Sequence, residues 1–212
     1  MLKLKARPDK PRLHPDARRE AILDVAQEVF LEEGFAAASM STIAARLGGS
    51  KGTLYNYFRS KDELFKAYVE RRCLWQQDTL FAVKSGETPQ AALQRIARSF
   101  LAFILDDVTL RNFAVIAAEA ERAPELGRIF YETGPKRGAE RLAAFLAGLD
   151  AAGGLDLDGD PLGAAHHLLG ILQSPSLKAR LCNAVPPLTP AQLDAEAARG
   201  VKTFLKAFGR RG

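Results

Sequence analysis

The chain has 212 residues, of which 47% are hydrophobic and 26% are charged. These proportions are those of an ordinary globular protein and exclude a disordered chain. Cys73 and Cys182 are too few for a disulfide scaffold or a four-thiolate zinc site, and we expect both to be buried. No apolar segment follows the basic N-terminus, and the longest uncharged stretch, residues 161–177, is a poor membrane span. We therefore expect a cytoplasmic protein.

The formal net charge of +5 is unevenly distributed along the chain. Residues 1–61 carry 11 Lys/Arg against 7 Asp/Glu, residues 62–159 carry 12 against 15, and residues 160–212 carry 7 against 3. The first basic block indicates a polyanionic partner, although basic tails are often only solvated. Residues 1–13 lack apolar periodicity, which predicts a flexible basic arm that is either unused or lies along phosphates.

An amphipathic helix is predicted from Pro15 to Gly34. Proline suits the first position of a helix, and glycine commonly follows the last. Between them, one apolar stripe recurs at the helical spacing i, i+3, i+4, i+7 and i+8. It consists of Ile22, Val25, Ala26, Val29 and Phe30.

Two short helices are predicted next. Ser39 is a candidate N-cap for the first of them, which Gly48 and Gly49 end. Ser50 is the candidate N-cap of the second, and a capping box at Ser60 opens a longer fourth helix. Only about three residues around glycine separate the second and third helices, which is typical of a helix-turn-helix.

The remainder of the sequence is helical throughout. The apolar pattern and the Gly and Pro positions predict helices over residues 61–83, 89–105, 109–121, 124–152, 161–174 and 190–209. Gly134 and Pro135 are expected to bend or break the helix that begins at Pro124. No period-2 stretch predicts a sheet. We expect an all-α protein with an N-terminal helix-turn-helix domain, residues 1–62, and a larger C-terminal helical domain, residues 63–212.

Residues 39–65 carry the chemistry that distinguishes this sequence. The N-termini of the two short helices would offer free N–H groups to an anion, and nearby hydroxyls and lysines would add donors and charge. Leu54 and Phe58 lie four residues apart and would face the core. Lys, Thr, Tyr and Asn side chains would then occupy the outside of the third helix, which suits a probe of the DNA major groove. The alternative is an ordinary capped helix pair with a polar surface.

This stretch resembles the N-terminal domain of the TetR family of bacterial transcriptional regulators. The resemblance is carried by EEGFAAAS, STIAARLG and SKGTLYNYFRSKDELF, and it is dense over residues 18–65. More weakly, EAERAPELGRIFYETGP and DGDPLGAAHHLLGIL are similar to the AcrR/AefR-like group. The resemblance implies a ligand-responsive regulator, in most cases a repressor. It would bind a palindromic double-stranded DNA operator as a homodimer and be released by a small hydrophobic effector.

Contacts to DNA follow from the resemblance, position by position. They fall on Ser41, Thr42, Ser50, Lys51, Gly52, Thr53, Tyr55, Asn56, Tyr57 and Lys61. One position departs from the family pattern, because Gly49 stands where an apolar residue usually precedes the third helix. We expect the turn to be more flexible there, and the recognition helix to be less firmly seated.

The C-terminal domain is expected to bind the effector and to dimerise. In the resembled family the middle helices surround the effector pocket, and the candidate lining residues are Phe100, Phe103, Ile104, Phe113, Ile116 and Glu119. The apolar faces of the last two long helices could pair with their twins in a four-helix seam, or could simply complete the protomer core. Their candidate interface residues are Leu162, Ala165, Leu169, Leu172, Ala197, Val201, Phe204, Leu205 and Phe208.

No metal site or cofactor is expected. His166 and His167 are adjacent, so they diverge on a helix and cannot chelate one ion together. The acidic run at residues 156–160 lacks the Gly and Glu positions of a calcium loop. No nucleophile elbow, phosphate loop or zinc signature is present, so an enzyme is the weakest interpretation. The alternatives to a regulator are an enzyme or carrier that uses the helical domain, and an adaptor that binds protein through its helical surface.

Overall fold

The computed structural model describes residues 15–72, 78–82, 84, 86–174 and 176–210. The basic arm, residues 1–13, lies outside the described residues. The helices are α1 (Pro15–Ala37), α2 (Met40–Arg46), α3 (Lys51–Tyr55), α4 (Lys61–Arg72), α5 (Asp78–Phe81), α6 (Pro89–Ile104), α7 (Asp107–Glu119), α8 (Pro124–Tyr131), the π-helix η2 (Glu132–Lys136), α9 (Arg137–Ala151), α10 (Pro161–Gln173), α11 (Leu177–Leu181) and α12 (Pro190–Phe208). The described residues contain no strand, only one isolated bridge between Leu155 and Gly209. The all-α prediction is confirmed.

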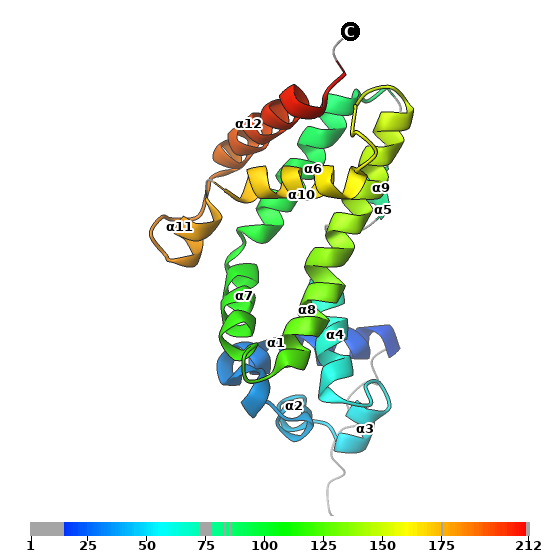
Figure 1. Ribbon diagram of the computed structural model, residues 1–212. Coiled ribbons are helices and arrows are strands. Elements are labelled where there is room, and N and C mark those ends of the chain that lie inside the picture. Colours follow the sequence, from blue (N-terminus) through cyan, green and yellow to red (C-terminus); the bar gives the residue numbers. More distant parts are fainter. Residues whose placement is uncertain (1–14, 73–77, 83, 85, 175, 211–212) are drawn as a thin grey trace, which may run out of the picture.

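Helices α1 to α4 gather at one end of the molecule, drawn at the bottom of Figure 1. The predicted stripe of α1 is buried, with Ile22 and Val29 fully inaccessible, and it packs on the apolar sides of α2, α3 and α4. The predicted boundary at residues 62 and 63 falls at the start of α4. The apolar side chains of that helix, such as Leu64 and Phe65, complete the N-terminal core.

Two columns of helix connect this end to the rest of the molecule. Helices α6 and α7 form one column, α8 and α9 form the other, and α10 crosses between them (Figure 1). At their lower ends, Ile116 of α7 and Leu126 and Ile129 of α8 are buried within the N-terminal core. The two parts of the chain therefore share apolar packing.

The C-terminal core lies at the upper end of the columns, between α6, α9, α10 and α12. Helices α10 and α12 approach closely because Gly200 has no side chain: a Cβ at this position would lie 2.6 Å from Leu172 Cδ2. The α12 N-terminus is closed by a capping box between Thr189 and Gln192. That pair explains why the helix begins at Pro190.

Gly134 and Pro135 change the helix type without breaking the column. Proline supplies no N–H, and its ring crowds the preceding turn of an α-helix. At this point the chain forms the π-helix η2, which joins α8 to α9. Gly134 is buried there, and both residues line the cavity described below.

Of the predicted helix over residues 61–83, the structure describes α4 and α5, and residues 73–77, with Cys73, lie outside the described residues. Two sequence expectations change in the structure. Cys182, expected to be buried, is exposed at the C-cap of α11. Gly34 does not end α1 but kinks it, with φ 76° and ψ 166°, and the helix resumes to Ala37.

The candidate dimer residues need the largest correction. Five of them lie below 9% exposure in the C-terminal core of their own protomer: Ala165, Leu172, Ala197, Val201 and Phe204. Leu205 is partly buried against that core. Leu169 lines the cavity, and Phe208 stacks on His167 with ring centroids 5.8 Å apart. Only Leu162, 44% exposed, offers a large apolar surface. The apolar stripes of α10 and α12 face each other and α6, so they complete the protomer core.

Candidate functional site

The helix-turn-helix is held by the two predicted serine caps. Ser39 Oγ accepts from the backbone N–H of Thr42 at 3.1 Å, and Ser50 Oγ accepts from that of Thr53 at 3.2 Å. Between α2 and α3, Gly48 adopts φ +66°, a conformation that other residues rarely take. These contacts fix the N-termini of both helices and the turn that joins them.

Helix α3 presents a polar face to solvent. Leu54 and Phe58 are buried, at 0% and 2% exposure, as their spacing predicts. Lys51 and Asn56 are exposed and Tyr55 is 48% exposed. Tyr57 is partly buried against the N-terminal core. Helix α3 and the three residues after it, anchored by Leu54 and Phe58, thus carry a lysine, an amide and a phenol outward.

The small Ser, Thr and Gly residues predicted to contact DNA divide into two kinds. Ser41 is exposed at the start of α2, and Gly52 is exposed on α3. The other hydroxyls are engaged in the caps, where Ser39 Oγ lies 2.9 Å from Thr42 Oγ1 and Ser50 Oγ lies 3.0 Å from Thr53 Oγ1. Their first role is therefore to hold the helix ends.

Lys61 has a different place from the one the resemblance implies. Its ammonium donates to the carbonyl oxygens of Phe35 at 2.6 Å, Ala38 at 3.0 Å and Ala36 at 3.4 Å. It also lies 4.3 Å from the centroid of the Phe35 ring. An ammonium has three N–H donors, and these three carbonyls use them. In this geometry Lys61 caps the end of α1 and has no donor left for a phosphate.

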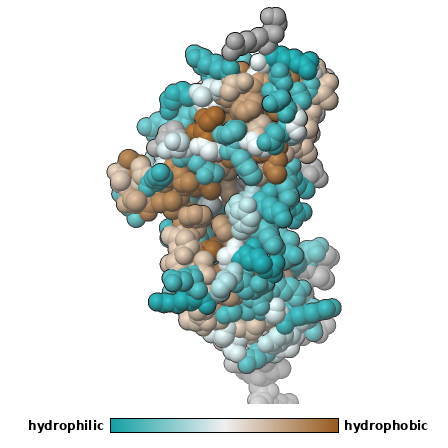
Figure 2. Space-filling model, in the orientation of Figure 1, coloured by the Kyte–Doolittle hydropathy of each residue, from teal (hydrophilic) through white to brown (hydrophobic). Residues whose placement is uncertain are grey.

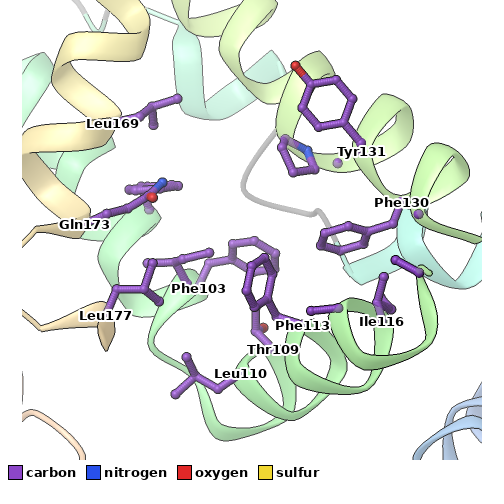
Figure 3. A pocket seen from close by; sticks show the side chains of 17 residues that line it. Phe103, Thr109, Leu110, Phe113, Ile116, Phe130, Tyr131, Leu169, Gln173 and Leu177 are labelled. Carbon is purple, nitrogen blue, oxygen red and sulfur yellow. The ribbon is translucent and has the colours of Figure 1, made fainter. Parts of the chain in front are cut away.

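A cavity of about 470 Å³ lies between the two columns, below α10. Its walls are apolar and largely aromatic, and Figure 3 shows the rings of Phe103, Phe113 and Phe130 around it. Phe113 and Phe130 meet edge to face, with centroids 6.1 Å apart. On the outer surface, hydrophobic side chains gather around α11 and across the molecule below it (Figure 2).

Few polar groups enter this cavity. The Thr109 hydroxyl already accepts from Arg72 Nη2 at 2.9 Å. The Gln173 side chain comes from α10 and lies along the wall (Figure 3). No charged side chain is among the described lining residues. The cavity therefore suits an uncharged molecule, because an ion would lose its hydration here without gaining a partner.

Five of the six predicted pocket residues line this cavity: Phe100, Phe103, Ile104, Phe113 and Ile116. The sequence interpretation missed Thr109, Leu110, Ala117, Ala120, Gly127, Phe130, Tyr131, Gly134, Pro135, Leu169, Gln173 and Leu177. The members of this set on α7 and at its C-cap, Ala120, lie three, four or seven positions from Phe113, so helical periodicity could have found them. Leu169, Gln173 and Leu177 come from distant sequence, and no local signal marks them.

Glu119 does not line the cavity and instead contacts the N-terminal helices. Its Oε2 accepts from the backbone N–H of Ala36 at 3.0 Å, across 83 residues of sequence. Gly34 makes room for this carboxylate, since a Cβ there would overlap Glu119 Oε1. The Ala36 peptide is thus held by Glu119 of α7 on its N–H side and by Lys61 of α4 on its carbonyl side.

Within the described chain, no helix has the length and apolar character needed to cross a membrane. The same residues hold no group of three or more His, Cys, Asp or Glu side chains that could bind a metal ion.

A capped helix-turn-helix with an outward polar helix, joined to a helical domain with an apolar cavity, defines a DNA-binding regulator. The model of the N-terminal domain of bacterial TetR-family regulatory proteins matches residues 22–68. The model of the AefR-like transcriptional repressor C-terminal domain matches residues 91–210, more than half of the chain. The chain belongs to the TetR family of bacterial transcriptional regulators.

Known relatives agree with this assignment. The transcriptional activator FasR of Mycolicibacterium smegmatis is 48% identical over 60 residues, which cover 28% of this chain and 27% of FasR. The structure of the flavonoid-responsive regulator FrrA has a TM-score of 0.77 and 34% identity, covering 93% of this chain and 100% of FrrA. A TetR-family regulator from Mesorhizobium loti MAFF303099 also has a TM-score of 0.77, with 28% identity, 94% of this chain and 100% of that chain. The chain covers less than two-thirds of the length of its first curated relatives. Both family models and all three relatives describe regulators of transcription rather than enzymes.

Proposed function

We propose that this protein is a ligand-responsive repressor that binds a palindromic operator as a homodimer and releases it when a small, uncharged, apolar molecule fills the cavity. A two-fold dimer would place its two recognition helices about 34–36 Å apart, one turn of DNA. Ligand would change that spacing through the packing of α7 and α8. The ligand can shift the affinity for DNA only to the extent that it binds the DNA-bound and the released arrangement of the dimer with different affinities.

The observation that carries this proposal is that the cavity and the N-terminal core share a wall. Ile116 lines the cavity and is also buried in the N-terminal core, and Phe103 and Phe130 touch both. A molecule that fills the cavity would contact these side chains, and any shift in them would pass to the N-terminal core because protein interiors are close-packed. A ligand would therefore act directly on the packing of α7 and α8 against α1 and α4.

The effector class follows from the walls of the cavity. Aromatic side chains favour a flat apolar molecule, and the Gln173 amide can bond a hydroxyl or carbonyl on it. The structural likeness to FrrA, a flavonoid-responsive regulator, supports an aromatic effector of flavonoid type. Repression rather than activation is favoured by the match to the AefR-like repressor domain, because the match to the activator FasR covers only the DNA-binding end.

The test uses the purified protein on DNA from upstream of its own gene. We expect a protected palindromic site whose occupancy falls at least tenfold with an uncharged flavanone and does not fall with laurate, an apolar anion of similar reach. Ala117→Phe, which fills part of the cavity, should abolish the flavanone response while DNA binding persists. Loss of DNA binding on adding laurate, or no site-specific protection under any condition, would contradict the proposal.

A further inference from the structure

Arg18 of α1 lies against the turn that precedes the recognition helix. A Cβ built on Gly49 would lie 2.8 Å from Arg18 Nη2, so the guanidinium occupies the space that a side chain at this position would take. Gly49 is not among the residues with positive φ, so its backbone does not itself require glycine. The departure from the family pattern at Gly49 thus makes room for an arginine.

Among the described residues, none is paired with the charge of Arg18. It makes no hydrogen bond or ion pair with another described residue, whereas Arg19 lies 5.3 Å from the Phe58 ring and Arg46 pairs with Glu32 at 2.5 Å. Its guanidinium lies against the backbone of Gly49, and its five N–H donors remain available to an anion.

Arg18 lies next to the predicted DNA-binding face. Gly49 is followed directly by Ser50, the N-cap of α3, and by Lys51, the first residue of α3, and both are exposed. Of the two lysines that the resemblance places on phosphates, Lys61 donates to backbone carbonyls instead. A guanidinium against Gly49, two residues before Lys51, supplies a second cation to this edge, with a planar shape that suits bidentate phosphate binding.

We propose that Arg18 binds a phosphate of the DNA backbone beside the recognition helix, and that glycine at position 49 is the condition for this contact. The proposal rests on the DNA-binding function proposed above. It predicts that Arg18 contributes to affinity for any duplex and carries no base specificity, since phosphates are the same in every sequence.

The test measures the affinity for a random-sequence duplex and for the operator as salt is varied. Each lost phosphate contact should lower the log–log slope by about 0.9 and the affinity at about 0.1 M salt by roughly eightfold per protomer. We expect this from Arg18→Ala on both duplexes. Gly49→Val, which displaces the guanidinium, should also weaken binding in the native background, but should have less than a twofold effect in the Arg18→Ala background.

Two controls separate the possible failures. Lys51→Ala reports on the DNA-binding function itself: if neither it nor Arg18→Ala changes the slope, the proposed function fails. Arg111→Ala removes an exposed arginine on α7, remote from α3, and should leave the slope unchanged. If Lys51→Ala lowers the slope and Arg18→Ala does not, the Arg18 assignment is overturned. An equal effect of Gly49→Val in both backgrounds would overturn it too, because the substitution would then act through the turn.

Discussion

Glu87 shows how one ion pair ties a connecting segment to the helical domain. The Arg95 guanidinium donates to both carboxylate oxygens of Glu87, at 2.9 and 2.8 Å, and also donates to Ala82 O at 3.0 Å. The hydrogen bonds from Arg95, together with one from the Lys84 backbone N–H, lower the pKa of Glu87 from 4.5 to about 2. The Glu87 side chain is only 12% exposed, so solvent competes weakly for this pair.

The lowered pKa of Glu87 sets the sign of a pH effect on stability. Between pH 4.5 and about 2 the unfolded chain binds a proton at this carboxylate and the folded chain does not. Stability from this group is therefore present above pH 4.5 and is lost as the pH falls toward 2.

We expect Glu87→Gln to be less stable than the native protein at pH 7, and its free energy of unfolding to fall less steeply on acidification. Denaturant unfolding at a series of pH values measures this, with the exposed Glu140→Gln as control. Parallel pH curves for the native protein and Glu87→Gln would contradict the assignment.

At the scale of secondary-structure elements, α7 is the part of the chain that both the cavity and the DNA-binding end share. One face of the helix lines the cavity, and its last residue, Glu119, holds the Ala36 peptide next to the start of α2. Helix α4 contributes a second link, because Tyr68 accepts from the Asn112 amide of α7 while buried at 1% exposure. Burial raises the pKa of Tyr68, so its phenol stays protonated at neutral pH.

We expect Glu119→Ala to weaken communication between the two sites without removing either. The substitution leaves the cavity wall and α3 intact but frees the Ala36 N–H from α7. The ratio of DNA affinities without and with flavanone should fall to about threefold, from a coupling that is commonly 5–150-fold. By linkage, DNA should then also lose its effect on flavanone affinity. Glu121→Ala, at the exposed end of the same segment, should keep the native ratio, and an unchanged ratio in Glu119→Ala would refute the role of this contact.

At the scale of the whole molecule, the packing of α10 and α12 decides which surface remains for a second copy. Their apolar stripes are buried in the protomer, so a homodimer through these helices has to use their outer faces. Gly170 lies on that face of α10, exposed, and a Cβ there would meet no atom within 4 Å. Leu162 lies two turns earlier on the same helix and is 44% exposed.

Gly170→Arg tests this surface without disturbing the protomer. Arginine favours helix more than glycine does, so the thermal midpoint of the isolated protomer should not fall. In a four-helix seam, however, the added side chain would separate the partners, and sedimentation should change from dimer to monomer. Gly148→Arg is the matched control, because Gly148 is also exposed on a helix and also has open space at its Cβ. A dimeric Gly170→Arg would place the seam on another face.

Much of this protein was readable from the sequence because its signals are local. Helix caps at Ser39 and Ser50 and the buried pair of Leu54 and Phe58 depend on spacings of a few residues, which the sequence displays directly. The tertiary structure decided everything that depends on which distant side chains meet. It turned Lys61 and Glu119 toward the backbone of Ala36, and it buried in the protomer the apolar faces of α10 and α12, for which the sequence left a dimer seam and a protomer core open. It also brought Gln173 to a cavity built mainly from α6, α7 and α8. The spacing of apolar residues shows that one face of a helix is apolar. Only the tertiary structure shows which residues cover that face, because they come from distant parts of the sequence.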